Sequence, residues 1–235
     1  MQAEHTIISA LRLEPANYTN SLLFSNLGVV RTEQGKYKDA LEAFSLGLSI
    51  APDSKGILNN RARTFMLMND YDRAMTDLSE SLRIDSIQEW TLQMRGLLRI
   101  NAKDTVGARH DFLLLAKNFH RNDRAFAGLA KISEWEGNYD DALKYYNEAI
   151  IINDEPEIRS ERIMLKIRTD KYSDASRDIK ESIEKYPQEP VFYLLRGHLH
   201  RLNYRYDEAE ADKKIAINKG ADPQIVERFI PKSGK

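Results

Sequence analysis

The chain has 235 residues, a formal net charge of −1, and 42% hydrophobic against 30% charged residues. The near-zero net charge argues against a general nucleic-acid binder, which normally carries a basic excess. Because the sequence contains no cysteine, disulfides, thiolate catalysis and cysteine-ligated zinc are excluded.

The sequence has no pattern of a membrane span or a leader. No apolar run approaches the roughly 18 residues that a membrane-spanning helix needs. Residues 1–20 contain Glu4, His5, Arg12 and Glu14, which a signal peptide would not carry. We therefore expect a soluble protein, either cytoplasmic or extracytoplasmic after removal of a leader that is absent from this chain.

A short motif recurs along the chain with a nearly constant period. An alanine marks each recurrence, and in most of them a tyrosine precedes it by three residues. Successive alanines are 34, 34, 34, 33 and 34 residues apart. Such self-similarity indicates stacked helical hairpins, since one hairpin cannot bury its apolar face alone. The alanines are Ala40, Ala74, Ala108, Ala142, Ala175 and Ala209.

This pattern resembles the tetratricopeptide repeat (TPR), over about residues 21–222. In that family a small residue precedes the alanine by twelve positions, as Gly28 does Ala40, and an aromatic follows it by four, as Phe44 does. The resemblance implies an all-α fold: a right-handed superhelical solenoid of about six helical hairpins. It also implies a binding scaffold, which is the family's usual role.

In chain order, the expected elements form a single solenoid domain over residues 1–235. An N-terminal half-repeat, residues 1–20, comes first, and its one helix has an uncovered apolar face with Ile7 and Leu11. We expect upstream residues of a longer natural chain, or a second molecule, to cover that face. Asp222 and Pro223 indicate a C-terminal capping helix over about residues 222–229. The six repeats between are 21–54, 55–88, 89–122, 123–155, 156–189 and 190–222.

An arginine of the first helix and an aspartate of the second occur together in four repeats, always sixteen residues apart. The first and fourth repeats have Leu27 and Leu129 in place of the arginine, and neither has the aspartate. We therefore predict an ion pair that bridges the two helices of each charged hairpin. The predicted pairs are Arg61–Asp77, Arg95–Asp111, Arg162–Asp178 and Arg196–Asp212.

The resemblance implies that the first helices line a concave groove. Both tryptophans, Trp90 and Trp135, fall on the groove side in this register. Of the family's carboxylate clamp for chaperone tails only Asn60 fits, so that ligand is not expected. We expect a central patch in repeats two to four, apolar with a cationic rim, to bind an acidic or carboxylate-bearing peptide. The candidate groove residues are Asn26, Asn60, Arg63, Met66, Trp90, Met94, Arg124, Lys131 and Trp135.

Patterns typical of catalysis are missing from the sequence. His198 and His200 are two residues apart, so they point to different faces of a helix, and no phosphate-binding glycine motif occurs. We expect no enzymatic activity, no catalytic residue, no metal site and no cofactor.

The favoured function is a non-enzymatic scaffold that binds a peptide or helix of a partner protein in the groove. One alternative is an RNA-binding helical solenoid like the pentatricopeptide class, although no nucleic-acid partner is expected. Another is a regulatory or targeting segment of a larger protein. Self-association through the N-terminal helix would be a further way to cover Ile7 and Leu11.

Overall fold

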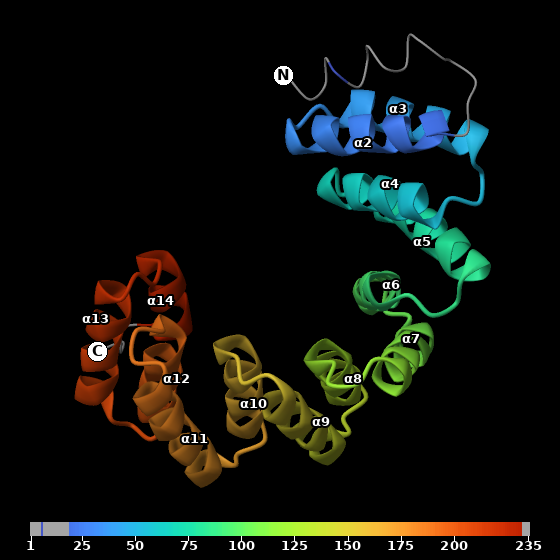
Figure 1. Cartoon of the computed structure of the whole chain (residues 1–235). Coiled ribbons are helices and arrows are strands. Elements are labelled where there is room, and N and C mark those ends of the chain that lie inside the picture. Colours follow the sequence, from blue (N-terminus) through green and yellow to red (C-terminus); the bar gives the residue numbers. More distant parts are fainter. Residues whose placement is uncertain (1–5, 7–18, 232–235) are drawn as a thin grey trace. The chain divides into compact units, whose positions relative to one another are not determined.

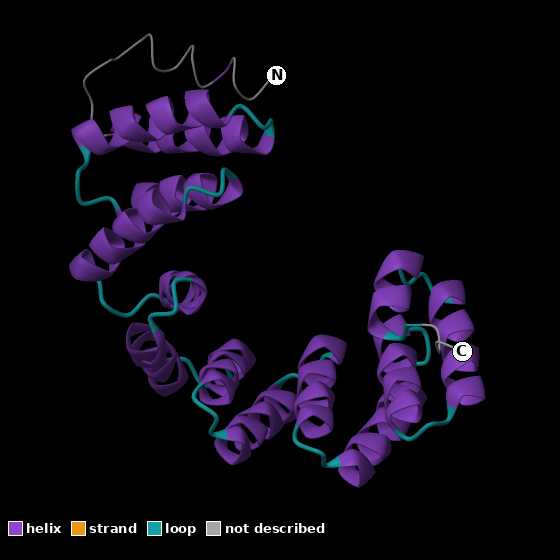
Figure 2. Ribbon diagram, turned by 180° about the vertical axis from the view of Figure 1, so that it is seen from behind, coloured by secondary structure: helices purple, strands orange, loops and turns teal. Residues whose placement is uncertain are grey.

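A computed structural model describes Thr6 and residues 19–231 of the chain (Figure 1). In this part the chain forms thirteen helices and no strand (Figure 2). Residues Met1–His120 and Arg121–Lys235 each form a compact unit, called unit 1 and unit 2 below. The expected half-repeat 1–20, with Ile7 and Leu11, lies almost wholly outside the described residues.

Unit 1 contains three hairpins, each made of a first and a second helix that pack along their length. Its helices are α2 (Thr19–Glu33), α3 (Tyr37–Ile50), α4 (Lys55–Leu67), α5 (Tyr71–Ile84), α6 (Glu89–Asn101) and α7 (Thr105–Asn118).

Unit 2 contains three further hairpins and a short terminal helix. Its helices are α8 (Asp123–Trp135), α9 (Tyr139–Ile152), α10 (Pro156–Arg168), α11 (Tyr172–Lys185), α12 (Pro190–Leu202), α13 (Tyr206–Asn218) and α14 (Pro223–Phe229).

A turn in the left-handed region ends every first helix and reverses the chain. At the end of α4, for example, the Asp70 amide donates to the Phe65 carbonyl at 2.8 Å, which satisfies an otherwise free helix-end group. The tyrosine that opens the second helix reinforces some of these turns: Tyr71 Oη donates to Asn69 Oδ1 at 2.8 Å. The residues with positive φ in these six turns are Gly35, Asn69, Lys103, Gly137, Asp170 and Tyr204.

Small residues on the first helices let large side chains of the second helices come close. A Cβ added to Gly28 would lie only 2.5 Å from Cε1 of Phe44, whose ring is fully buried. Burying such a ring contributes about 2–3 kcal/mol. In the fifth repeat the sizes change: Ile163 replaces the small residue, and Ile179 replaces the aromatic opposite it, and both are buried. Two medium side chains therefore fill the same space as glycine and phenylalanine.

The C-terminal segment completes the core of the last hairpin. The buried Lys213 occupies the position of the aromatic, and its ammonium group pairs with Glu227 at 2.8 Å. The space beside Gly197 is filled instead by Ile230, whose Cδ1 would lie 2.6 Å from an added Cβ. The expected capping helix is α14, and Asp222 caps it by accepting from the Gln224 amide at 2.7 Å.

All four predicted arginine–aspartate pairs are confirmed. The N–O distances are 2.7 Å for Arg61–Asp77, 2.7 Å for Arg95–Asp111, 2.9 Å for Arg162–Asp178 and 2.6 Å for Arg196–Asp212. Each aspartate is buried, so the pairs hold the two helices together from inside the hairpin.

A second basic side chain, absent from the sequence prediction, approaches three of these aspartates. Arg99 lies 2.7 Å from Asp111, Lys166 lies 2.7 Å from Asp178, and His200 Nδ1 lies 3.2 Å from Asp212. Each follows the pairing arginine by four residues and therefore lies on the same helix face. In the second repeat that position is Phe65, so Asp77 receives one cation only among the described residues.

Candidate functional site

The candidate groove residues belong to both units, so they form two separate faces. The first-helix face of unit 1 consists of Asn26 on α2, Asn60, Arg63 and Met66 on α4, and Trp90 and Met94 on α6. The first-helix face of unit 2 consists of Arg124, Lys131 and Trp135, all on α8.

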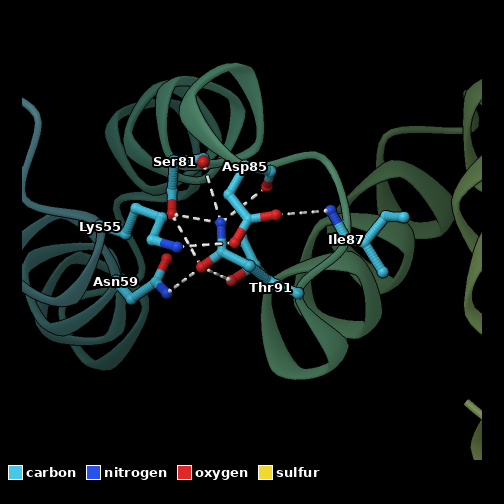
Figure 3. Close-up of polar contacts among 7 residues, drawn as sticks. Lys55, Asn59, Ser81, Asp85, Ile87 and Thr91 are labelled. Carbon is cyan, nitrogen blue, oxygen red and sulfur yellow. Dashed lines mark hydrogen bonds and ion pairs between the residues drawn. The ribbon is translucent and has the colours of Figure 1, made fainter.

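The start of α6, which carries Trp90, is fixed by a polar network around Gln88 (Figure 3). The Gln88 amide nitrogen donates to the Ser81 carbonyl and the Asp85 carbonyl, both at 2.9 Å. Its oxygen accepts from Asn59 of α4 at 3.1 Å. The Gln88 side chain therefore links α4 and α5 to the start of α6, the helix that carries Trp90.

A second contact in the same network joins α4 to the end of α5. Lys55 Nζ lies 2.6 Å from Asp85 Oδ2, and Asp85 Oδ1 accepts from the Ile87 amide at 3.2 Å (Figure 3). These bonds hold the pKa of Asp85 below its usual value, the Lys55 hydrogen bond most strongly. The carboxylate therefore stays charged at neutral pH and can keep its bonds to Lys55 and to the Ile87 amide.

The side chains of the first-helix face of unit 1 differ in how much they are exposed. Trp90 is 37% exposed, and Arg63 and Asn26 are exposed as well. Met66 and Met94 are half-buried, because they pack against the core cluster that contains Phe65 and Leu78 (Leu78 is fully buried). The two methionine side chains are thus only partly available to contact a ligand.

Hydrogen bonding on this face leaves one cation free. Asn60 Nδ2 donates to Ser25 Oγ of α2 at 3.3 Å, which ties two neighbouring first helices together. Arg63 makes no ion pair with any residue that the structure describes. Leu22 of α2 and Leu97 of α6 are apolar and exposed as well. The face can therefore offer a tryptophan ring, flexible thioethers and one unneutralised guanidinium group.

The first-helix face of unit 2 carries two cations, and one of them is paired. Lys131 pairs with Glu161 of α10 at 3.1 Å, so it is not a free cation. Arg124 is exposed and has no ion-pair partner in the described part of the chain, and Trp135 is 51% exposed. The predicted cationic rim is thus reduced here to Arg124.

A buried carboxylate lies next to Trp135. Glu134 pairs with Arg168 of α10, and its Oε2 accepts from Tyr146 Oη at 3.4 Å. Burial raises the pKa of Glu134 above its ordinary value, although Arg168 acts in the opposite direction. The pKa of Tyr146 is also raised, first by burial and then by the Glu134 charge.

Sequence reasoning did not identify Gln88, nor the pairing of Lys131 with Glu161. The second could have been found, since opposite charges 30 residues apart fall on neighbouring first helices. Between residues 19 and 231, histidine and carboxylate side chains nowhere gather in a group of three or more that could hold a metal ion. None of the helices described there is long and apolar enough to cross a membrane.

Comparison with known proteins shows which repeat and which fold the chain resembles. A crystal structure of a tetratricopeptide repeat protein from Parabacteroides merdae is 27% identical to this chain, with a TM-score of 0.73. The match covers 97% of this chain and 89% of that one. A family model described as tetratricopeptide repeat matches residues 56–88. The chain therefore contains a tetratricopeptide repeat at residues 56–88 and has the helical-repeat fold of tetratricopeptide-repeat proteins.

Tetratricopeptide-repeat proteins match over shorter stretches as well. Tetratricopeptide repeat protein 36 of Caenorhabditis elegans is 33% identical over 72 residues, which is 31% of this chain and 40% of that protein. A homolog of the same protein from Drosophila pseudoobscura pseudoobscura is 34% identical over 90 residues, covering 36% of this chain and 48% of its own length. The match spans less than half the length of these curated relatives.

A more distant solved structure shows the same fold. YrrB, described as a TPR protein with an unusual peptide-binding site, is 17% identical, with a TM-score of 0.59. That match covers 80% of this chain and 97% of YrrB. The tetratricopeptide repeat is in general a scaffold for protein interaction, and this chain has that fold.

Proposed function

We propose that this helical-repeat protein acts by binding and not by catalysis, and that its first-helix faces bind a peptide or helix of a partner protein. The main contact is proposed on the first-helix face of unit 1, with Trp90 as its anchor. Two side chains on consecutive first helices support this proposal most directly: the exposed Trp90 of α6, and Arg63 of α4, which makes no ion pair with a described residue. Tryptophan and arginine are enriched among the residues that dominate binding energies at protein interfaces.

The chemistry of this face favours a particular kind of peptide. Trp90 and Leu97 of α6 would pack against one apolar side chain, and Leu22 of α2 against another part of the peptide, while Arg63 would bond a carboxylate of the same peptide. The thioethers of Met66 and Met94 can adapt to side chains of different shapes. We therefore propose a ligand with one large apolar residue and one acidic residue close together.

The first-helix face of unit 2 is proposed as a second, weaker contact surface. Trp135 supplies an exposed ring, and Arg124 supplies the unpaired cation. Lys131 is already neutralised by Glu161, so it would contribute less to binding an acidic ligand than Arg124.

Selection of peptides from a random phage-displayed library on the immobilised full chain tests this function. We expect enrichment of peptides that carry an acidic and an aromatic or aliphatic residue. Trp90→Ala should weaken the selected peptides by about tenfold, a typical loss for an interface anchor. Val106→Ala, which shortens an exposed side chain on the second helix α7, is the matched control and should leave affinity unchanged.

Two results would contradict the proposal. A large fall in melting temperature for Trp90→Ala, with peptide affinity intact, would make Trp90 a structural residue. Tight, salt-sensitive retention of single-stranded RNA in a filter-binding assay, with no peptide enriched, would favour the RNA-binding alternative.

A further inference from the structure

Unit 2 contains a cavity whose lining shares no residue with the first-helix face of that unit. The cavity has a volume of about 590 Å³ and lies between α11, α12 and the turn that follows α12. This volume is within the range of roughly 300–1,000 Å³ that is common for small-molecule sites. All its lining residues belong to unit 2.

The cavity arises where one repeat lacks a large side chain. The residue after the motif alanine is Leu41, Met75 and Leu143 in the first, second and fourth repeats. These three side chains pack against the core clusters formed with neighbouring helices. The fifth repeat has Ser176 at this position, and Ser176 lines the cavity. A small hydroxyl side chain therefore leaves unfilled a groove that leucine or methionine occupies in the first, second and fourth repeats, whereas the third and sixth have Arg109 and Glu210 at this position.

The floor of the cavity is apolar. Ile179 of α11 and Leu199 of α12 are core residues that also line it, and Ile183 is half-buried beside them. A ligand with an aliphatic body would cover this surface and remove it from water, which is favourable in proportion to the area buried.

The rim of the cavity favours an anion. Lys180, Arg196 and Arg205 supply three permanent positive charges, against Glu184 as the one carboxylate of the lining. Arg196 is paired with Asp212 and Arg205 with Glu208, but Lys180 makes no ion pair with any described residue. The hydroxyl groups of Ser173 and Ser176 likewise have no hydrogen-bond partner among the described residues, so both can donate to a ligand.

We propose that this cavity binds a small organic acid, in which an aliphatic body lies on Ile179, Ile183 and Leu199 and a carboxylate is held at Lys180 and the two serines. This site is separate from the proposed peptide-binding faces, and neither proposal depends on the other. It would give the scaffold a second ligand with a chemistry different from that of its protein partner.

Methyl NMR of the full chain, labelled at isoleucine δ1 positions, tests the site with octanoate as the probe. We expect octanoate to shift the Ile179 and Ile183 signals in a saturable manner. Octan-1-ol, which has the body without the charge, should bind more weakly. Acetate, which has the charge without the body, should give no shift.

Two variants and a control locate the ligand. Ser176→Leu copies the residue that Leu143 supplies in the fourth repeat, and it should fill the groove and abolish the octanoate shifts. Lys180→Gln should weaken octanoate by about tenfold, as expected for losing one charge-assisted bond. Lys214→Gln, at the same repeat position in α13 and also exposed, should have no effect.

The assignment would be overturned by unchanged octanoate shifts in Ser176→Leu, or by octan-1-ol binding as tightly as octanoate. A leucine-ending tripeptide with a free carboxylate that shifts the same methyl groups at lower concentration would overturn the free-acid assignment. The end of a protein chain would then be the ligand.

Discussion

The hairpins α4–α5 and α8–α9 have helices of the same lengths, 13 and 14 residues, but different contacts between them. In α4–α5 the buried Asp77 accepts two hydrogen bonds from Arg61, both at 2.7 Å. In α8–α9 the corresponding residues are the buried Leu129 and the half-buried Tyr145. The same hairpin is therefore built around either an ion pair or an apolar contact.

This difference indicates that the ion pair is not needed to form the hairpin. Burying two charges costs desolvation energy that their attraction roughly repays, so an apolar pair of similar size can be as stable. Removing one partner is different, because it leaves the other charge buried and unpaired. The pair therefore makes each helix dependent on its own partner helix.

Arg61→Met gives the largest expected effect. It leaves Asp77, which is 3% exposed, with no cation, so the free energy of unfolding should fall by about 3–5 kcal/mol. Urea unfolding followed by circular dichroism measures the loss. Arg95→Met should cost less, because Arg99 still lies 2.7 Å from Asp111.

The double variant Arg61→Met with Asp77→Leu is the control for this prediction. It replaces the ion pair by an apolar contact like the one in α8–α9, and should recover a large part of the lost stability. If the losses in the free energy of unfolding simply added, Arg61 and Asp77 would not be coupled. An apolar pair could then not replace the ion pair in this hairpin.

Gly28→Ala should have the next largest effect. It lies in α2–α3, the other hairpin in which the first-helix arginine of the arginine–aspartate pair is replaced, here by Leu27. Because an added Cβ would lie 2.5 Å from the buried Phe44 ring, we expect a loss of about 1–3 kcal/mol in urea unfolding. Adding Phe44→Leu should restore stability, since it recreates the Ala62 and Leu78 combination of the second repeat.

Gly56→Ala is the matched control for Gly28→Ala. Nothing lies within 4 Å of a Cβ added at Gly56, so alanine should stabilise α4 by about 0.5–1 kcal/mol through its helix propensity. A loss of stability at Gly56 similar to that at Gly28 would show that glycine itself, and not the Phe44 contact, sets the effect.

Tyr146→Phe should have a smaller effect in the apolar hairpin α8–α9. It removes one hydrogen bond to Glu134, which is weak because it is long at 3.4 Å, and Glu134 keeps its ion pair with Arg168. We expect a loss of about 1 kcal/mol or less in thermal or urea unfolding. A loss as large as that of Arg61→Met would mean that this hairpin also depends on a buried polar contact.

The smallest effect is a local pH response at α14. Burial lowers the pKa of His198, whose ring lies 5.1 Å from that of Phe229. A hydrogen bond with the Phe229 backbone acts in the opposite direction and the nearby Arg201 in the same direction, and the pKa remains below its ordinary value. The neutral form is therefore favoured when α14 is docked, and docking is independent of this group above the ordinary histidine pKa of about 6.5. As the pH falls below that value, the undocked state takes up the proton first and docking weakens.

Hydrogen-exchange protection of the Val226 and Ile230 amides measures this response. Protection should fall between pH 7 and pH 5 in the native chain, and should fall less in His198→Gln. Equal pH dependence in both proteins would assign the response to another group.

The sequence predicted the hairpins and their ion pairs because both depend on regular spacing. A residue of the first helix and one sixteen positions later face each other in every repeat, so Arg61 and Asp77 could be paired by counting alone. Arg99 and Lys166, the second cations, each follow the pairing arginine by four residues and so lie on the same helix face. Their contacts with the aspartates could therefore have been predicted too.

Other features could not be predicted from spacing. The bonds of Gln88 depend on the path of the loop between α5 and α6, which no repeat position specifies. The half-burial of Met66 and Met94 depends on the size of neighbouring side chains in the same core cluster. The sequence therefore predicts the helices, but it does not predict how far the side chains of the first-helix faces are exposed.

The matched arginine and aspartate of each charged hairpin have a consequence for how such arrays can be rearranged. If a single helix were exchanged between the second and fourth repeats, Arg61 would meet Tyr145, or Leu129 would meet Asp77, and one charge would be stranded in the core. Exchange of a whole hairpin keeps both partners together. The hairpin, and not the helix, is thus the smallest piece that recombination or protein engineering can move without separating the arginine from its aspartate.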